Sequence, residues 1–581
     1  MISGEKIMNI VDSERLKKCC YIVLAFATFF RIVLSSGYVY EYIVNAGMDD
    51  QWMVISAYNI LGGQWLGAYG STTLIKSVTY PFMLAFFRAL GIPYGIGLGV
   101  FVALVTYVFV KAIKPVAKNL LLRSVIYISV LYSPFGFLTI TSARIYRTSV
   151  SHWMTLLVIA SYIGLYFRRD WEIKKLWKWI VCEAVALMMF WELREDHIWI
   201  LAFVIPAFLI ILIYRIWHNK KDFLKNTVVM LVPFVMTVVM EIGIATINYN
   251  KYGVFTGNDR TGTYCGKVMS LLYKIDDGEV HDQSVWVSEG AFKKAMEVSP
   301  TLNKYSEMLD EEFNNWRIPT QYGIEVQGDH AEWALRGALD NAGLYKDAVS
   351  TNEEYKKIYN DLKTGFESGM LKEKKGISLS SQMRPFNMND IDVAFSLTRK
   401  VMFKYANYDS RTGVYVAYTT AGMDPDEKSM FENILLMNIT EQHPDADRDQ
   451  ISLGERATQR YGVLVMKIFN AMHKVYKRLA VFLNYICLGI MIFMVASMIC
   501  ELKNKSFYSF YAFIITAGLL LVIFAFTFMI SLWGLALTTD ASNGMYWFYG
   551  SSGPMMFQVW RILCLCYVIN RIGMILEKEH F

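Results

Sequence analysis

Long apolar runs constrain the fold of this chain more than any other feature. A helix needs about 20 predominantly apolar residues to cross a bilayer, and the sequence offers about ten such runs. They lie at roughly 19–37, 94–113, 121–141, 149–168, 178–193, 197–216, 227–247, 476–500, 507–535 and 554–575. Hydrophobic residues make up 54% of the chain, which fits neither a soluble globular protein nor a disordered one. We predict an all-α polytopic membrane protein with about ten transmembrane helices.

Basic residues orient these helices, because cytoplasmic loops carry an excess of Lys and Arg. Alternate connections are basic: Arg15/Lys17/Lys18, Lys111/Lys114/Lys118/Arg123, Arg168/Arg169/Lys174/Lys175/Lys178, Lys220/Lys221/Lys225, Lys503/Lys505 and Arg571/Lys578. Both termini are therefore predicted to be cytoplasmic. A cluster on the outer side runs against this topology: Lys467, Lys474, Lys477 and Arg478. We keep the topology because long domains translocate largely regardless of charge.

The apolar runs divide the chain into three parts. Residues 1–247 form an N-terminal transmembrane module with a first outer loop at 38–93, and residues 471–581 form a C-terminal module of three helices. Residues 248–470 form a polar insertion, predicted to be a mostly helical extracytoplasmic domain. Apolar residues recur in it at three- and four-residue spacing over Ser288–Met296, His330–Asn341, Asn352–Ser368 and Met388–Tyr408.

Cysteine usage and net charge indicate the setting of the protein. Only Cys265 lies in the insertion, so that domain cannot hold an internal disulfide. Together with the short loops, this favours a bacterial plasma (inner) membrane. The formal net charge of +6 is too small to indicate nucleic acid, so the lipid bilayer is the partner that composition predicts.

Charged residues in the first outer loop are candidates for function, since ionisable groups beside membrane helices are costly to place. Asp49 and Asp50 follow the first apolar run, and Lys76 is a lone cation between two amphipathic segments. A carboxylate here can act as a general base toward a hydroxyl, and an ammonium can hold a phosphate. Alternatively, one aspartate caps a helix starting near Gln51, and Lys76 snorkels to the lipid headgroups.

Two further charged clusters lie at later outer connections. Arg144 and Arg147 are three residues apart, and their planar guanidinium groups suit phosphate, with interfacial anchoring as the alternative. The second cluster consists of Arg194, Glu195, Asp196 and His197. This tight connection can bind a divalent cation or a phosphate, or it can be a solvated turn whose aspartate caps the next helix.

The order of these parts resembles the first outer loop of GT-C fold glycosyltransferases, membrane enzymes that take a sugar from a polyprenyl-phosphate carrier. The shared order is the aspartate pair, then Ala57, Leu61 and Gly63-Gln64-Trp65, then Lys76, then Tyr80-Pro81 on a second amphipathic helix. It is similar to the aminoarabinose transferase and protein mannosyltransferase branches and covers roughly residues 20–200. The Trp-Trp-Asp motif of oligosaccharyltransferases is absent, which argues against a peptide asparagine as acceptor.

The resemblance implies roles for the charged residues. Asp49 would be the acidic residue at the reacting centre, with Asp50 second, and Glu195-Asp196 would match a second outer acidic motif. The implied reaction moves a sugar from a polyprenyl-phosphate carrier to an extracytoplasmic glycan, lipid or protein, with Asp49 as general base. The expected cations for the departing phosphate are Lys76, Arg144, Arg147 and Arg194. A divalent cation (Mg, Mn or Ca) at Glu195 and Asp196 is left open.

Three other interpretations stay open. A GT-C-like ligase or polymerase that moves glycans from a polyprenyl-diphosphate carrier would use the same cations. A transporter or flippase needs polar residues buried in mid-span, for which Glu183 and Glu192 are the candidates. A membrane anchor presenting the 248–470 domain would leave the charged loops unexplained. Convergence of Asp49, Lys76 and Glu195-Asp196 on one outer cavity is expected only of the enzyme.

Overall fold

Helices build nearly all of the chain that the structure describes. The computed structural model describes residues 14–44, 47–218, 223–417, 419, 422–439, 453–503 and 506–579. Within these ranges, eight helical segments are long and apolar enough to cross a membrane. They are α2 (Glu14–Ser36), α5 (Tyr94–Ala112), α8 (Thr148–Tyr166), η2 (His197–Ile200) with α10 (Leu201–His218), α11 (Phe223–Tyr252), α21 (Leu453–Lys503), α22 (Tyr508–Gly534) and α24 (Ser552–Glu579). The predicted class, a helical polytopic membrane protein, is confirmed.

The apolar run at 121–141 does not form one membrane-crossing helix, so this part of the prediction is wrong. It divides into α6 (Leu120–Leu131), η1 (Pro134–Gly136) and α7 (Thr139–Ser142). Proline cannot continue a helix, because it lacks the backbone N–H and clashes with the preceding turn. Irregular backbone is tolerated at membrane depth only where protein buries it, and residues 133–139 are all buried.

The run at 178–193 forms a helix of sufficient length, α9 (Ile173–Trp191). It is not among the eight, because Lys174, Lys175, Lys178 and Glu183 lower its mean hydropathy. It nevertheless packs along both α8 and α11. The total number of membrane crossings therefore stays a prediction.

Three buried arginines donate to backbone carbonyls at helix ends or in the connections between helices of the bundle. Arg31 donates to Leu131 O at 3.2 Å and to Gly136 O at 3.1 Å, at the break after α6. Arg168 donates to Ala112 O at 3.0 Å, at the end of α5, and Arg215 donates to Trp171 O at 2.8 Å. Unpaired carbonyls are costly in a bilayer, and cations favour helix C-termini. These arginines therefore have a structural explanation without a ligand.

Close packing of α2 and α5 depends on two glycines one turn apart. A Cβ atom at Gly95 would lie 2.6 Å from Ser35 O, and one at Gly99 would lie 3.0 Å from Ile32 Cα. Small residues at four-residue spacing let membrane helices approach backbone to backbone.

Gly95→Ala is expected to lower the free energy of unfolding by about 1–3 kcal/mol, because the backbone of α2 cannot give way cheaply. The measurement is thermal unfolding in detergent. Gly243→Ala is the matched control, because a Cβ atom there meets nothing within 4 Å. Equal stability of the two variants would contradict the close contact.

The insertion begins with a compact globule that the sequence patterns largely anticipate. Its elements are α12 (Asp259–Gly262), α13 (Tyr264–Leu272), α14 (Glu289–Val298), α15 (Pro300–Asn303), α16 (Ser306–Trp316), β1 (Arg317–Thr320), β2 (Gly323–Val326), α17 (His330–Asn341) and α18 (Ala348–Glu367). Strands β1 and β2 form an antiparallel hairpin in which Arg317 faces Val326. The hairpin was not expected, because the predicted elements of the insertion are all helical.

The rest of the insertion lies on the bundle. Helix α19 (Met388–Ala406) packs against α22, and α20 (Pro425–Leu435) packs against α3 (Asp50–Leu61) and α4 (Thr79–Ala89). The boundary predicted at 470 falls inside the continuous α21. The first part of α21 is held against the N-terminal module, because the Tyr461 hydroxyl donates to Val33 O and Phe469 stacks on Phe137.

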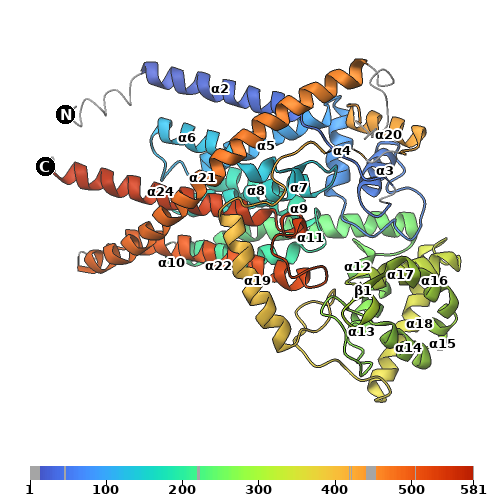
Figure 1. Ribbon diagram of the computed structural model, residues 1–581. Helices are drawn as coiled ribbons and strands as arrows, with labels where there is room; N and C mark the ends of the chain where they lie inside the picture. Colours follow the sequence, from blue (N-terminus) through green and yellow to red (C-terminus); the bar gives the residue numbers. More distant parts are fainter. Residues whose placement is uncertain are drawn as a thin grey trace.

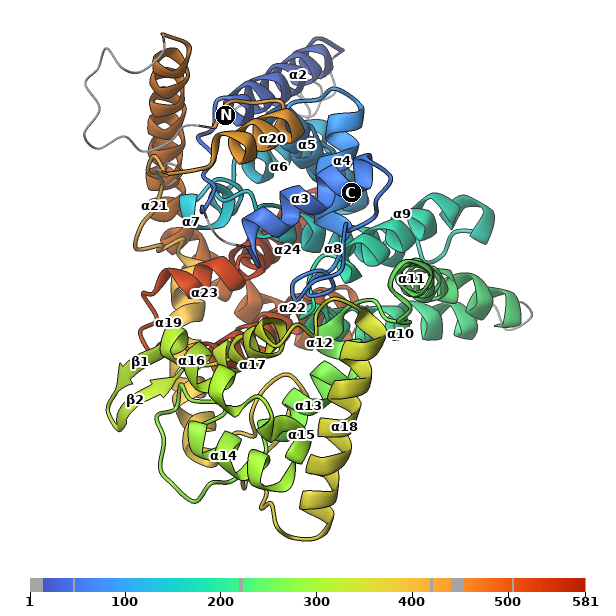
Figure 2. The same ribbon diagram turned by 90° about the vertical axis from the view of Figure 1, so that its right-hand side faces the viewer.

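The bundle has two distinct ends. In Figure 1, α2 begins and α24 ends at one end, and the globule with α3 and α4 lies at the other. Figure 2 looks onto this second end, where α3, α4 and α23 (Gly544–Tyr549) lie across the bundle beside the globule. The charged residues predicted to lie in outer loops meet one another at this end.

Candidate functional site

Asp49 occupies the position before α3, but its side chain does not cap that helix. The carboxylate accepts a hydrogen bond from Lys76 Nζ at 2.8 Å and one from Arg144 Nη2 at 3.0 Å. Its side chain is 36% exposed. Burial alone would raise the pKa of Asp49, but the two cations outweigh burial and hold the pKa well below its usual range. Asp49 is thus an accessible, ionised carboxylate clamped by two cations.

Lys76 is buried and does not snorkel to the headgroups. Its ammonium donates to Asp49 and also to the Tyr146 hydroxyl at 2.9 Å. Burial lowers the pKa of Lys76 to about 8, with Arg147 acting in the same direction and Asp49 and Glu195 against it. Hydrogen bonds to Asp49 and Tyr146 therefore keep this ammonium close to both acidic motifs.

A short backbone bridge places Arg144 beside the aspartate pair. Glu41 N–H donates to Ala143 O at 2.9 Å, and Ile145 N–H donates to Glu41 O at 3.1 Å. The guanidinium of Arg144 then reaches both carboxylates, with Nε 2.6 Å from Asp50 Oδ1. Segments about one hundred residues apart in sequence meet at one cation.

Asp50 differs from Asp49 in its burial and in its partners. Its side chain is 0% exposed, and it accepts the Ile43 N–H at 3.1 Å in addition to the Arg144 contact. Burial raises the pKa of Asp50 to about 7, although Arg144 pulls it down. One guanidinium shared by two carboxylates cannot fully stabilise both, and the buried one bears the penalty. Asp50 is therefore placed to position Arg144 and not to meet a substrate.

The raised pKa of Asp50 has a consequence for stability. Between about pH 4 and 7 the folded chain keeps a proton on Asp50 that the unfolded chain releases, so the free energy of unfolding falls as pH rises. The expected slope is up to about 1.4 kcal/mol per pH unit. Asp50→Asn should lack this component, which denaturation at pH 5 and pH 8 measures. An identical pH dependence in Asp50→Asn and the wild type would contradict the shift.

The second acidic motif lies beside the first through Glu195. Its carboxylate is 2.6 Å from Arg147 Nη1 and accepts the Ser77 N–H at 2.9 Å. Burial would raise the pKa of Glu195, but Arg147 outweighs burial and holds it well below its usual range. Because Ser77 follows Lys76 directly, the structure brings Asp49, Lys76 and Glu195 together.

An aromatic ring that the sequence analysis did not single out lies at the centre of this cluster. The Tyr146 centroid is 5.2 Å from Lys76 Nζ, 5.1 Å from Arg144 Cζ and 5.2 Å from Arg147 Cζ. Its ring stacks on Phe548 of α23 at 5.7 Å. The position of Tyr146 between Arg144 and Arg147 was the only available signal. Phe548 gave none, because it belongs to the C-terminal module.

The remaining residues of the second motif form a local turn. Asp196 accepts two hydrogen bonds from Arg194, at 2.8 and 2.6 Å, and Arg194 also lies over Tyr549. His197 stacks on Trp191 at 3.8 Å. Among the described residues, no group of three or more His, Cys, Asp or Glu side chains has the arrangement of a metal site. A divalent cation at Glu195 and Asp196 would have to displace an arginine from each, and it stays a prediction.

The charges of the cluster balance. Asp49, Asp50, Glu195 and Asp196 are the acids, and each is matched by a neighbouring cation from Lys76, Arg144, Arg147 and Arg194. An incoming phosphate must therefore draw a cation away from a carboxylate. The site has cations that can bind a phosphate, but each of these cations is already paired with a carboxylate of the cluster.

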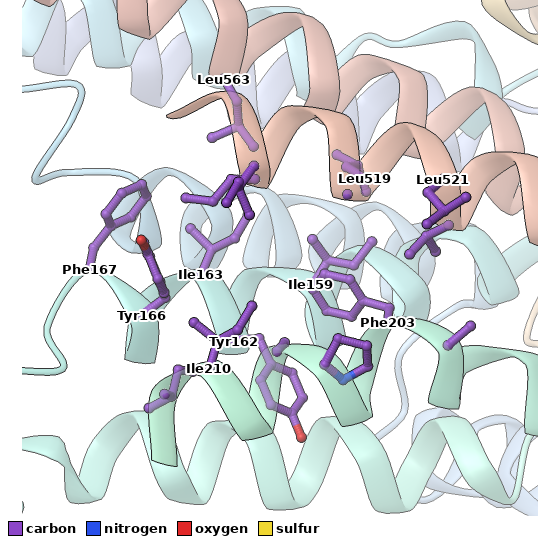
Figure 3. Close-up of a pocket in the computed structure, with 18 of the residues that line it drawn as sticks. Ile159, Tyr162, Ile163, Tyr166, Phe167, Phe203, Ile210, Leu519, Leu521 and Leu563 are labelled. Atoms are coloured by element: carbon purple, nitrogen blue, oxygen red, sulfur yellow. The ribbon is translucent and has the colours of Figure 1, made fainter. Parts of the chain in front are cut away.

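An apolar groove lies within the helical bundle (Figure 3). It has a volume of about 350 Å³ and lies between α8, α10 and α22, and Leu563 of α24 also lines it. Leu521 and Ile210 are exposed at its edge, so it opens sideways. Phe203 lines one end of the groove. It follows His197 by six residues in the chain, which is roughly 9 Å along a helix. A long apolar chain could lie here with its head near the charged cluster.

Comparisons of the chain with protein-family models, with curated proteins and with solved structures found no match. The functional inference therefore depends on the geometry of the charged cluster and on the resemblance of its motifs.

Proposed function

We propose that this protein is a GT-C-like membrane glycosyltransferase that transfers a sugar from a polyprenyl-phosphate carrier to an extracytoplasmic glycan, lipid or protein. The observation that carries the proposal is the meeting of Asp49, Lys76 and Glu195 in one cluster with Arg144 and Arg147. A transporter or a passive anchor gives no reason for these three loops to converge.

In the proposed reaction, Asp49 accepts the proton of the acceptor hydroxyl. The hydroxyl oxygen attacks the anomeric carbon, and the bond between that carbon and the phosphate oxygen breaks. The carrier leaves as a polyprenyl phosphate with one more negative charge than in the donor. Lys76 and the arginines stabilise this charge where it develops. Asp49 suits the base role because it is the exposed carboxylate of the pair.

The ion pairs suggest how donor binding prepares the base. With both cations in place Asp49 is a weak base, since its pKa is held low. A donor phosphate that attracts Lys76 removes one of these partners, and the basicity of Asp49 rises. The same ammonium then faces the phosphate as its charge grows. Asp49 would thus be an effective general base only when the donor is bound.

The surroundings of the cluster suit the two substrates. The apolar groove can take part of the isoprenoid chain of the carrier. The globule contacts the first outer loop just before Lys76: Asp259 N–H donates to Leu74 O at 2.7 Å, and Arg336 donates to Ser71 O at 2.9 Å. This contact brings the globule beside the loop that carries Lys76, and we expect the acceptor to approach there.

The test is transfer by the purified chain in lipid nanodiscs. Lipid-linked sugars labelled in the sugar are supplied, and the label is followed into acceptor material. Release of polyprenyl phosphate, identified by mass spectrometry, is the expected result. Release of polyprenyl diphosphate would favour the ligase or polymerase alternative, and no release from any lipid-linked donor would contradict the proposal.

Lys76→Met is expected to weaken binding of polyprenyl phosphate by about 10–100-fold, the range for one charge-assisted hydrogen bond. Arg144 still pairs with Asp49 in this variant, so the fold should persist. Native mass spectrometry measures the bound carrier. Lys174→Met, an exposed lysine at the opposite end of the bundle, is the control. Unchanged binding in Lys76→Met would remove Lys76 from the phosphate site.

A further inference from the structure

Helix α19 crosses the bundle near the end at which the globule lies. In Figure 1 it runs across the direction of α22 and α24. Phe395 packs on Phe524 with ring centroids 5.6 Å apart. Phe524 is ten residues before the end of α22, or about 15 Å along the helix. The 27 residues of α22 span about 40 Å, roughly 10 Å more than the hydrocarbon core. Phe395 therefore meets α22 about 5–10 Å inside the edge of the hydrocarbon core, which is the depth to which a helix lying in the interface buries its apolar face.

The C-terminal end of α19 is fixed to the bundle. Arg561 of α24 donates to Ala406 O, and its Nε donates to Asn484 Oδ1 of α21 at 2.8 Å. Asn484 in turn donates to Asn407 Oδ1 at 2.9 Å. Tyr405 packs edge-on against Trp547 at 5.3 Å. The helix is thus a rigid part of the membrane interface and not a loosely attached linker.

The free face of α19 mixes apolar and basic side chains. Phe403 is 65% exposed on this face, and Phe395, whose ring also packs on Phe524, is 49% exposed at its edge. Arg399 and Lys400 are exposed between them. Neither cation has an ion pair or hydrogen bond with the described part of the chain. Such a face is typical of a helix lying in a membrane surface, with aromatic rings in the acyl region and cations at the phosphates.

These cations border a hollow of about 620 Å³. Its lining combines Arg399, Lys400, Phe403 and Lys404 of α19 with Asp409 and the loop 539–542. Asp409 is already matched by Lys404 and Lys477, and Asp540 is the acidic residue of the loop. The hollow therefore keeps a positive excess beside an exposed aromatic ring.

We propose that this hollow binds the phosphate headgroup of an anionic phospholipid from the leaflet on the globule's side. Arg399 and Lys400 contact the phosphate, and Phe403 contacts the first part of an acyl chain. The depth of α19, the two unmatched cations and the adjacent exposed ring all fit this ligand. The bound lipid would hold α19, and with it the globule, at a fixed height over the charged cluster. This inference is independent of the proposed glycosyltransferase activity.

The test uses the full chain in nanodiscs with equal amounts of phosphatidylglycerol and phosphatidylcholine, and native mass spectrometry counts retained lipids. Each basic residue near an anionic surface contributes about fivefold in binding. The double variant Arg399→Ala/Lys400→Ala is therefore expected to lose at least about tenfold in phosphatidylglycerol retention. Arg399→Lys/Lys400→Arg should restore it. Lys356→Ala/Lys357→Ala, which removes two lysines of α18 in the globule, is the matched control.

Several results would overturn the proposal. Equal retention of the two lipids by the wild type would remove the headgroup preference. Unchanged retention in Arg399→Ala/Lys400→Ala, or an equal loss in Lys356→Ala/Lys357→Ala, would place the lipid elsewhere. Displacement of the lipid by millimolar inorganic phosphate would indicate a site for soluble anions. Persistence of the lipid against inorganic phosphate supports the contact with Phe403.

Discussion

Asp49→Asn is expected to lower the rate of sugar transfer by about 10²–10⁴-fold, the usual contribution of general-base catalysis. The amide has the shape of the carboxylate but cannot accept the proton of the acceptor hydroxyl. Folding should persist, because Asp49 is the exposed member of the pair and Arg144 keeps Asp50 as a partner. The measurement is initial transfer rate at saturating donor, together with thermal unfolding of the same preparation.

The control for Asp49→Asn is Glu307→Gln, which removes an exposed carboxylate on α16. It should transfer sugar at the wild-type rate. If Asp49→Asn transfers sugar normally and Asp50→Asn does not, the base is Asp50 and the assignment by exposure is wrong. If neither substitution changes the rate, the glycosyltransferase proposal loses its central residue.

Arg144→Met is expected to lower the free energy of unfolding by about 3–5 kcal/mol, the range for removing one partner of a buried ion pair. Asp50 would then be a wholly buried carboxylate whose remaining hydrogen bond comes from the Ile43 N–H. Asp50→Asn should be milder, because Arg144 still pairs with Asp49 at 3.0 Å. Denaturation of both variants at pH 8, where Asp50 of the wild type is mostly ionised, provides the comparison.

Two features separate this mechanism from a general loss of packing. The double variant Arg144→Met/Asp50→Asn should recover much of the lost stability, because no buried charge remains. Lowering the pH to 5 should also reduce the penalty of Arg144→Met, since protonation neutralises Asp50, whose pKa burial raises to about 7. A penalty that is the same at both pH values and persists in the double variant would show that Arg144 acts through its packing on Tyr146 and Phe548.

The first outer loop illustrates how far sequence reasoning reached. The order of the motifs predicted Asp49 as a base and Lys76 as a phosphate holder, and it made their convergence with Glu195-Asp196 the test of the enzyme hypothesis, but it did not predict the ion pairs among them. The contacts between these residues follow from the path of residues 62–78, which returns the chain from α3 to the start of α4. The choice between Asp49 and Asp50 could not be made from sequence, because two adjacent residues of one type differ only in which direction they face.

Other features had no local signal. Residues 121–141 form one continuous apolar run in the sequence. Only the tertiary structure shows that the helix breaks after α6 and that Arg31 donates to the carbonyls at this break. Phe548 lies about four hundred residues from Tyr146, so their stacking depends on the packing of the C-terminal module. Similarly, α19 shows an ordinary helical pattern, and its exposed Phe395 and Phe403 became informative only once its depth along α22 was known.

The sequence by itself determined the class of the protein and the residue types available for chemistry, and it predicted that the charged loops share one face of the membrane. These follow from local properties: the length of apolar runs, the distribution of basic residues and the cost of placing charge beside a membrane. The tertiary structure decided which carboxylate is exposed, which cation holds it and which aromatic ring lies among the cations. Those outcomes depend on burial and on distances between remote segments, and neither is encoded at any single position of the chain.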